Sequence, residues 1–240
     1  MVIKLKRDTY SGADGSSLSD DRCQQIISLY DFWLNHPGVT YRELQVAAVK
    51  EKLYTGQAAS IIRTFCKLLK KLSFVEYSDG QPFIFTDMGT VFVRTHRALL
   101  EAQKSDNPLL TSKLLGLKQT IIMGGIEEMS KDPNYDEHPI WIAIGLLKHF
   151  NTIDWKEHYY ALYLLYEKNM IWKDIITKIS ENRTKQVEYD VQNANGEALA
   201  NTGYSYIRSL LLEAGLITNI KSKSSLVPSN KEFIEKINKF

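Results

Sequence analysis

Polar and basic side chains recur along one side of the segment from Thr55 to Lys71. Gln, Ser, Thr and Arg side chains can hydrogen-bond base edges and phosphates, and lysines can neutralise phosphates. Ile62, Phe65 and Leu69 lie on the opposite side at helical spacing. This pattern predicts a helix that packs through one side and contacts DNA through the other. The predicted contact residues in this helix are Gln57, Ser60, Arg63, Thr64, Lys67 and Lys71.

The flanking segments predict the surroundings of a DNA-reading helix. Thr40 and Glu43 have the spacing of a capping box, which starts a short helix. The stretches "SFVEY" and "PFIFT" flank an Asp-Gly turn and predict a β-hairpin. Amphipathic helices are predicted at residues 21–35 and 87–103. This order is typical of a winged helix-turn-helix, although the tip of the hairpin is acidic rather than basic.

The last third of the chain predicts the same order a second time. "DWKEHYYALYLLYEKN" and "IWKDIITKISEN" have helical periodicity, and "TGYSYIRSLLLEAGLI" predicts a third helix that ends at Gly215 in a left-handed C-cap. "LITNIKSKSSLVP" predicts a second hairpin with a basic tip, and "SNKEFIEKINKF" a closing helix. The segment "SIIRTFCKLL" at 60–69 can be laid on "SYIRSLLLEA" at 205–214, which favours the duplication of one fold.

The second copy offers its own polar residues for DNA contacts. Lysines between serines at its hairpin tip suit the sugar-phosphate backbone or the minor groove. A polar stretch from Thr184 to Asn201 precedes the third helix, and two alternatives stay open: it orders on DNA, or it is simply flexible. The predicted contacts of this copy are Arg183, Lys185, Tyr204, Ser205, Arg208, Ser209, Lys221 and Lys223.

These patterns predict a mainly α-helical fold with small β-hairpins, in which two winged helix-turn-helix subdomains are joined by a helical connector. Residues 1–19 are rich in Ser, Gly and Asp and are expected to form an extended or poorly ordered arm. Residues 20–104 are predicted to form the first subdomain and residues 105–150 the connector, which is broken at "KDPNYDEHP". Residues 151–240 are predicted to form the second subdomain.

The composition limits the function classes. The chain has 240 residues, 44% hydrophobic and 24% charged, as in ordinary globular proteins. Its net charge is only +2, so a DNA-binding surface has to be local. Cys23 and Cys66 are too few for a disulfide scaffold, and Cys66 falls in an apolar stripe that predicts a buried thiol. The sequence lacks a signal-type core and a membrane-length apolar run, which predicts a cytoplasmic protein without membrane contact.

Motifs of common enzymes do not occur in the sequence: it contains no HExxH, Walker loop or GxSxG. The best nuclease-like set combines Asp136 with Asp154 and Lys156, which could hold a divalent ion and polarise water. The intervening "PIWIAIGLLKHF" is helical in pattern, whereas that chemistry normally lies on paired strands. Asp154 therefore fits better as a helix N-cap or first-turn acid. No catalytic residue, metal ligand or cofactor for binding is predicted.

Two segments carry a family resemblance. "HPIWIAIGLLKHFNTIDWKEHYYALYLL" followed by "NTGYSYIRSLLLEAGLI" resembles the DNA-recognition part of type IIS restriction endonucleases of the FokI-like and AlwI-like group. "FTDMGTVFVRTHRALL" matches more loosely the helix after a first wing. The resemblance implies tandem winged helices that read an asymmetric site on double-stranded DNA. It also implies a separate, Mg²⁺-dependent cleavage domain in cis beyond this chain, and no catalytic residue is carried over.

Several alternatives remain at the sequence level. A plasmid replication initiator and a transcriptional regulator are also built from winged helices, and both would bind repeated sites. A winged-helix protein-interaction scaffold is compatible with the near-neutral net charge. An enzyme with a novel site is a further hypothesis, which Mg²⁺-dependent cleavage of plasmid DNA would test.

Overall fold

The computed structural model describes residues 2–6, 18–53, 65–135, 138–192, 202–220 and 223–237. The protein is mainly helical with small sheets, which confirms the predicted fold class at that level. The chain divides into two compact units. The central unit consists of residues 15–135, and the terminal unit consists of residues 1–14 and 136–240. The division falls inside the segment 105–150 that the sequence predicted as a connector.

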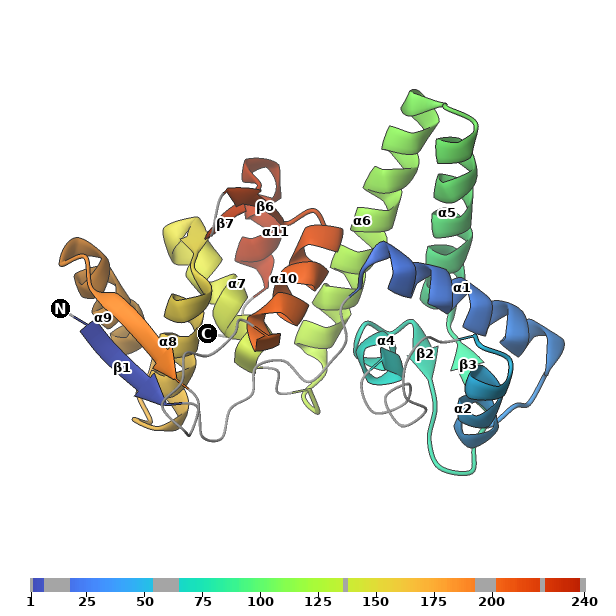
Figure 1. The fold of residues 1–240 in the computed structure, drawn as a ribbon, viewed down its shortest axis with the longest axis horizontal. Helices are drawn as coiled ribbons and strands as arrows, with labels where there is room; N and C mark the ends of the chain where they lie inside the picture. The colour runs from blue at the N-terminus through green and yellow to red at the C-terminus, as the bar shows by residue number, and fades with distance from the viewer. Residues whose placement is uncertain are drawn as a thin grey trace. The chain divides into compact units, whose positions relative to one another are not determined.

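The central unit combines helices with one short hairpin, in the order that the sequence predicted. The helices α5 and α6 lie side by side as an antiparallel pair (Figure 1). Strands β2 and β3 pair in antiparallel register. The described elements are α1 (Asp20–Asn35), α2 (Tyr41–Lys50), α4 (Lys67–Lys71), β2 (Val75–Glu76), β3 (Ile84–Phe85), α5 (Asp87–Lys104) and α6 (Pro108–Lys131).

The residues between α1 and α2 make one β-bridge to the hairpin segment and then cap α2. The Phe83 backbone N–H donates to the Val39 carbonyl at 2.7 Å, and Thr40 bridges Pro82 in antiparallel fashion. The Thr40 backbone N–H donates to Glu43 Oε2 at 2.8 Å, and the Glu43 N–H donates to Thr40 Oγ1 at 3.4 Å. The predicted capping box is confirmed, and the strand-like residues before it tie the start of α2 to the hairpin.

The end of α4 turns sharply into the hairpin. Ser73 has a left-handed backbone (φ 58°), and the Phe74 N–H donates back to the Leu69 carbonyl at 2.8 Å. This is the bond pattern of a Schellman helix end. Phe74 then stacks on Phe92 of α5 with ring centroids 4.7 Å apart. The helix end and the following helix therefore share one aromatic core.

The terminal unit has the same succession of a helix, a short strand and a capped helix. Its three-stranded sheet has the order β4-β7-β6, with both pairings antiparallel. Asp154 caps the helix after β4: its Oδ1 accepts from the Lys156 N–H at 2.8 Å. The elements are β1 (Val2–Lys6), α7 (His138–Phe150), β4 (Thr152–Ile153), α8 (Trp155–Tyr166), α9 (Trp172–Thr184), β5 (Glu188–Gln192), α10 (Thr202–Glu213), β6 (Ile217–Ile220), β7 (Lys223–Leu226), the 3₁₀ helix η2 (Pro228–Asn230) and α11 (Lys231–Lys236).

Helix α10 ends in the same way as α4. Gly215 has φ 67°, as expected for a glycine at a left-handed helix end, and the Leu216 N–H donates to the Leu211 carbonyl at 2.9 Å. The left-handed C-cap predicted at Gly215 is confirmed. A chain that leaves a helix through this turn is redirected immediately, which is why β6 begins only two residues later.

The two helix ends give a different alignment of the two segments from the one that the sequence suggested. Matching their hydrogen bonds places Leu69 on Leu211, whereas the sequence echo placed Leu69 on Ala214. The echo is therefore three residues out of register, close to one helical turn, and a shift of that size preserves the apolar periodicity. In the corrected register Arg208 corresponds to Cys66, so the shared "Ile-Arg" pair does not place Arg63 and Arg208 at equivalent positions.

The first residues of the predicted N-terminal arm are extended and form a strand. Val2–Lys6 form β1, which pairs in parallel with β5 from Glu188 to Gln192 (Figure 1). Part of the stretch 184–201 that lacked clear periodicity is thus a strand. Leu5 is 1% exposed, and Tyr189 and Val191 of β5 are also buried. The alternation of buried and exposed residues in β5 matches a strand with one covered face.

Two buried histidines predict loss of stability in acid. Burial lowers the pKa of His96, with help from the Lys118 ammonium, and also that of His158, to about 4 in each case. The unfolded chain, with pKa values near 6.5, binds more protons between these limits, so stability is complete above pH 6.5 and falls as the pH drops towards 4. We expect the free energy of unfolding to fall by on the order of 3 kcal/mol per histidine over this pH range. Urea unfolding followed by circular dichroism between pH 7 and 4 measures it.

The matched variant for this prediction is His96→Leu. Neither ring nitrogen of His96 has a hydrogen-bond partner among the described residues, so leucine leaves no donor or acceptor of another residue unpaired. Its unfolding free energy should fall less steeply with decreasing pH than that of the original protein. Equal slopes for the two proteins would contradict a buried, neutral His96.

Candidate nucleic-acid interface

The predicted DNA-reading helix of the central unit is described only in its last part. Gln57, Ser60, Arg63 and Thr64 lie outside the described residues. Lys67 begins α4 and is half-buried. Cys66 is buried as a free thiol, as predicted, and burial raises its pKa to about 12. The thiol therefore stays protonated at neutral pH and behaves as a small apolar group.

The lysines at the end of α4 serve the fold rather than an open surface. Lys71 is 1% exposed, so the prediction that it faces outward is wrong. It lies at the edge of the apolar stripe of α4, a helix that contacts α6 and β2. The Lys70 ammonium donates to the Tyr77 carbonyl at 2.9 Å and lies 5.0 Å from the centroid of the Tyr77 ring. Neighbouring elements cover this turn, which helical periodicity alone does not reveal.

The acidic tip of the first hairpin is offset by an arginine from α2. The Arg42 guanidinium lies 2.8 Å from Asp79 Oδ1, and the Tyr41 hydroxyl donates to the same carboxylate at 3.4 Å. Both members of the ion pair are well exposed. Tyr41 also approaches Tyr77 with ring centroids 5.7 Å apart. The start of α2 and the hairpin thus form one continuous polar surface with locally balanced charge.

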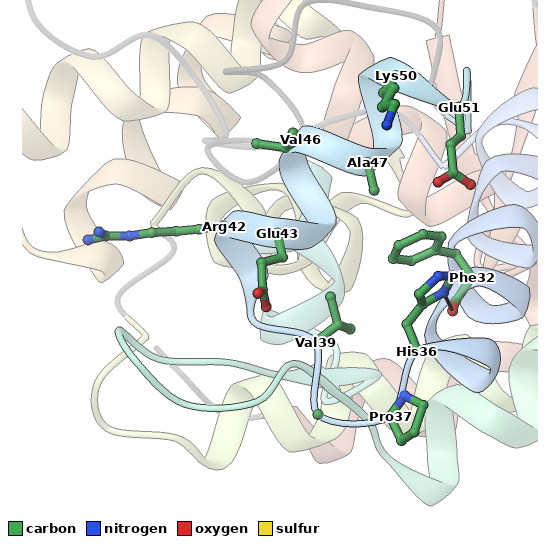
Figure 2. Close-up of a pocket in the computed structure, with 11 residues that line it drawn as sticks. Phe32, His36, Pro37, Val39, Arg42, Glu43, Val46, Ala47, Lys50 and Glu51 are labelled. Carbon is green, nitrogen blue, oxygen red and sulfur yellow. Dashed lines mark hydrogen bonds between the residues drawn. The ribbon is translucent and has the colours of Figure 1, made fainter.

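A shallow hollow of about 680 Å³ lies between the end of α1 and α2 in the central unit. Figure 2 shows Phe32, Val39 and Ala47 directed into it, whereas Arg42 points away. His36 stacks on Phe32 with ring centroids 4.0 Å apart. The floor formed by these described residues is mainly apolar, with charged groups at the rim. We therefore assign no DNA contacts to the hollow itself.

Helix α10 divides its predicted contact residues between core and surface. Tyr204 is buried, and its hydroxyl donates to Ser224 Oγ of β7 at 3.2 Å, so its prediction as a surface residue is wrong. Burial raises the pKa of Tyr204 to about 12, which keeps this hydroxyl a donor. Ser205 is exposed, and Arg208 and Ser209 are partly exposed. These three residues remain on the open side of α10.

Tyr206 was missed by the sequence analysis. It is 41% exposed and lies beside Ser205 on α10. Most aromatic residues in this chain occur at helical spacing and were assigned to the core. The available signal was its position two residues after Tyr204, because residues two apart on a helix face different directions. An exposed tyrosine on this side can stack on a base or donate to a phosphate.

Arg183 is part of the framework of the terminal unit. Its Nε and one terminal nitrogen donate to the two Glu157 carboxylate oxygens at 2.9 and 2.7 Å. Its remaining donors reach the Thr152 hydroxyl and carbonyl at 3.2 and 2.8 Å, and the guanidinium lies 4.2 Å from the Phe150 ring centroid. The prediction that Arg183 contacts DNA conflicts with this use of its donors. It instead joins the end of α9 to β4 and α8.

The other predicted lysines of the terminal unit lie near carboxylates or outside the described residues. Lys185 is exposed and lies 3.7 Å from Glu181. Lys223 is exposed at the start of β7 and lines a polar hollow of about 650 Å³ together with Asp154, Glu188 and Asp190. Lys221 lies outside the described residues. Because Glu188 and Asp190 of β5 line the same hollow as Lys223, the positive charge near this hairpin is smaller than its lysines alone would give.

The nuclease-like set receives no support from its one described acid. Asp154 and Glu157 form a capping box, in which the Asp154 N–H donates to Glu157 Oε2 at 3.4 Å. Its prediction as an N-cap is confirmed, and Asp136 lies outside the described residues. Within the described ranges, no group of three or more His, Cys, Asp or Glu side chains is placed to hold a metal ion. No described helix is long and apolar enough to cross a bilayer.

The site that emerges is the open side of α10 with Tyr206, Arg208 and the adjoining start of β7. Comparison with protein-family models, curated proteins and solved structures gave no match, so the assignment of this surface rests on its own geometry.

Proposed function

We propose that the chain binds double-stranded DNA sequence-specifically through two winged helix-turn-helix units. The observation that carries the proposal is the repeated architecture. In the terminal unit β4 precedes the capped helix α8 and pairs with β7, and in the central unit the residues before the capped helix α2 bridge the chain just before β3. In each unit, too, the helix before the hairpin ends in the same left-handed turn. This repeat supports the proposal, because helix-turn-helix proteins likewise present the last helix of a short helical series to the major groove.

The contacts assigned to the terminal unit follow from exposure. Ser205, Tyr206, Arg208 and Ser209 share the open side of α10, and Lys223 adjoins the hairpin tip. Serine and arginine suit base edges or phosphates, and a lysine on the wing suits the backbone. In the central unit we assign Lys67 of α4, which is half-buried, and Arg42 of α2, which lies beside Asp79 at the hairpin tip. Lys71, Arg183 and Tyr204 are not included, because the fold uses them.

We further propose that the chain is the target-recognition module of a type II restriction endonuclease of the FokI-like or AlwI-like kind. Such a module would act with a Mg²⁺-dependent cleavage domain in cis. A plasmid replication initiator or a transcriptional regulator is the alternative within the DNA-binding class. Selection from random DNA separates them, because a short asymmetric site supports the restriction hypothesis and repeated sites support the alternatives.

The test of DNA binding is a double variant, Arg208→Ala with Lys223→Ala. We expect its affinity for the selected site at moderate salt to fall about tenfold or more, because each lost phosphate contact weakens a salt-dependent term. The slope of log affinity against log salt should also become shallower. Electrophoretic mobility shift over a salt series measures both quantities.

The control removes the same charge elsewhere. Lys104 and Lys131 are exposed at the ends of α5 and α6, and their double alanine variant should keep the original affinity. Equal affinity losses in both double variants would indicate a response to net charge rather than contacts. An absence of any selected site for the original chain would reject DNA binding.

One observation favours the protein-interaction scaffold as a second candidate. Helix α6 carries four exposed leucines in its N-terminal half, between 42% and 68% exposed, where an ordinary surface helix is polar. If the scaffold hypothesis holds, the original chain and the Arg208→Ala/Lys223→Ala variant should bind DNA with the same low, non-specific affinity. The four leucines are Leu109, Leu110, Leu115 and Leu117.

A further inference from the structure

The chain passes between the two units twice. The terminal unit contains residues 1–14 as well as 136–240, and the central unit lies between them in sequence. One passage lies in the eleven residues 7–17, between β1 and Leu18. The other is the six residues 132–137, between α6 and α7. The pairing of β1 with β5 therefore closes a loop of the chain that contains the whole central unit.

Strand β1 is held to the terminal unit along its full length. Its five residues pair with five residues of β5. Leu5 is buried opposite Val191, and Lys4 lies opposite Asp190, an arrangement that favours this register. Tyr189 of β5 packs on Tyr160 of α8 with ring centroids 5.0 Å apart. The strand is thus anchored through β5 to the core of the terminal unit.

The described strands β1 and β5 pair only with each other. Two-stranded sheets are marginal alone, and parallel pairs normally belong to larger covered sheets. The terminal unit also has its own three-stranded sheet, which β1 does not extend. Strand β1 therefore attaches the first residues of the chain to the terminal unit, whose other residues begin at 136.

We propose that β1 is a second tether that sets the spacing between the two DNA half-sites read by the central and terminal units. This inference rests on the proposed DNA-binding function. One connection joins the two units at a single point of the chain. A second connection of eleven residues, at most about 40 Å when extended, adds a limit on the distance between the units. The restriction raises the effective concentration of one unit at its half-site once the other is bound.

The experiment compares three proteins on DNA libraries in which two half-sites are separated by variable spacers. The first is the full chain, the second lacks residues 2–6, and the third carries twelve Gly/Ser residues inserted between Gly15 and Ser16. The inserted protein keeps β1 and its pairing but lengthens the tether. We expect the full chain to select a narrow range of spacings. Both variants should accept a broader range and bind the best composite site about ten- to a hundredfold more weakly, with half-site affinities unchanged.

A matched control inserts the same twelve residues between Ser105 and Asp106, in the turn between α5 and α6 of the central unit. That turn does not join the units, so the selected spacing should stay narrow. If the full chain binds its site and the Gly15–Ser16 insertion keeps the same narrow spacing and affinity, the tether is rejected while DNA binding stands. The tether is also rejected if only the deletion broadens the spacing, because β1 would then act within the terminal unit. A full chain that selects no DNA overturns both proposals.

Discussion

Replacing Arg183 by methionine is expected to lower the free energy of unfolding of the terminal unit by about 3 kcal/mol. Arg183 is 27% exposed and Glu157 is 10% exposed, so the carboxylate would remain mostly out of water without its cation. Methionine keeps much of the packing on Phe150 but has none of the four hydrogen bonds to Glu157 and Thr152. Urea unfolding followed by circular dichroism and tryptophan fluorescence measures the loss.

Three companion variants identify the cause. Lys185→Met lies two residues away in an exposed ion pair and should change stability by less than about 1 kcal/mol. Arg183→Lys should recover only part of the loss, because lysine lacks the planar fork that reaches Glu157 and Thr152 together. Arg183→Met combined with Glu157→Gln should lower the free energy of unfolding by less than the sum of the losses of the two single variants. An Arg183→Met protein as stable as Lys185→Met would contradict a structural role.

Replacing Gly89 by alanine is expected to destabilise the central unit by about 3 kcal/mol, at the upper end of the usual cost of overpacking. A Cβ at this position would overlap the Phe74 carbonyl oxygen and lie 2.8 Å from its carbon. That oxygen already accepts from the Thr86 N–H at 3.1 Å, so the backbone on both sides is constrained. Helix α5 would have to move away from the turn that follows α4.

Gly116→Ala is the matched control in α6. Nothing lies within 4 Å of a Cβ at that position, and alanine is a better helix former than glycine. Its unfolding free energy should rise by up to about 1 kcal/mol. Opposite signs for the two glycine-to-alanine changes, read by thermal and urea unfolding, are the expected result. A stable Gly89→Ala protein would mean that α5 does not press on Phe74.

Features encoded by neighbouring residues were predicted well. The capping box at Thr40, the N-cap at Asp154, the left-handed turn at Gly215 and the two hairpins depend on side chains and backbone groups within a few residues. Such signals are readable because the interacting groups are fixed by local spacing. In the candidate site, Ser205, Arg208 and Ser209 were named as polar residues of the predicted third helix, and all three are exposed or partly exposed on α10.

The residues that were misjudged depend on distant partners. Lys71 is buried at the end of α4, Tyr204 reaches Ser224 on β7, and Arg183 reaches Glu157 and Thr152 across more than twenty positions. A polar side chain is ambiguous in sequence, because it can face solvent or satisfy a partner elsewhere in the fold. Periodicity reports which side of a helix is apolar but not what covers the edges of that side.

The sequence by itself determined the helices, their caps, the hairpins and the mainly helical class, because each follows from local periodicity and short-range hydrogen bonds. Only the tertiary structure decided the register between the two copies, the pairing of β1 with β5 and the division between framework and surface residues. Helical repeats tolerate a shift of about one turn, and a parallel strand pair can join residues at any separation. Those choices are made by long-range packing, which a linear pattern does not encode.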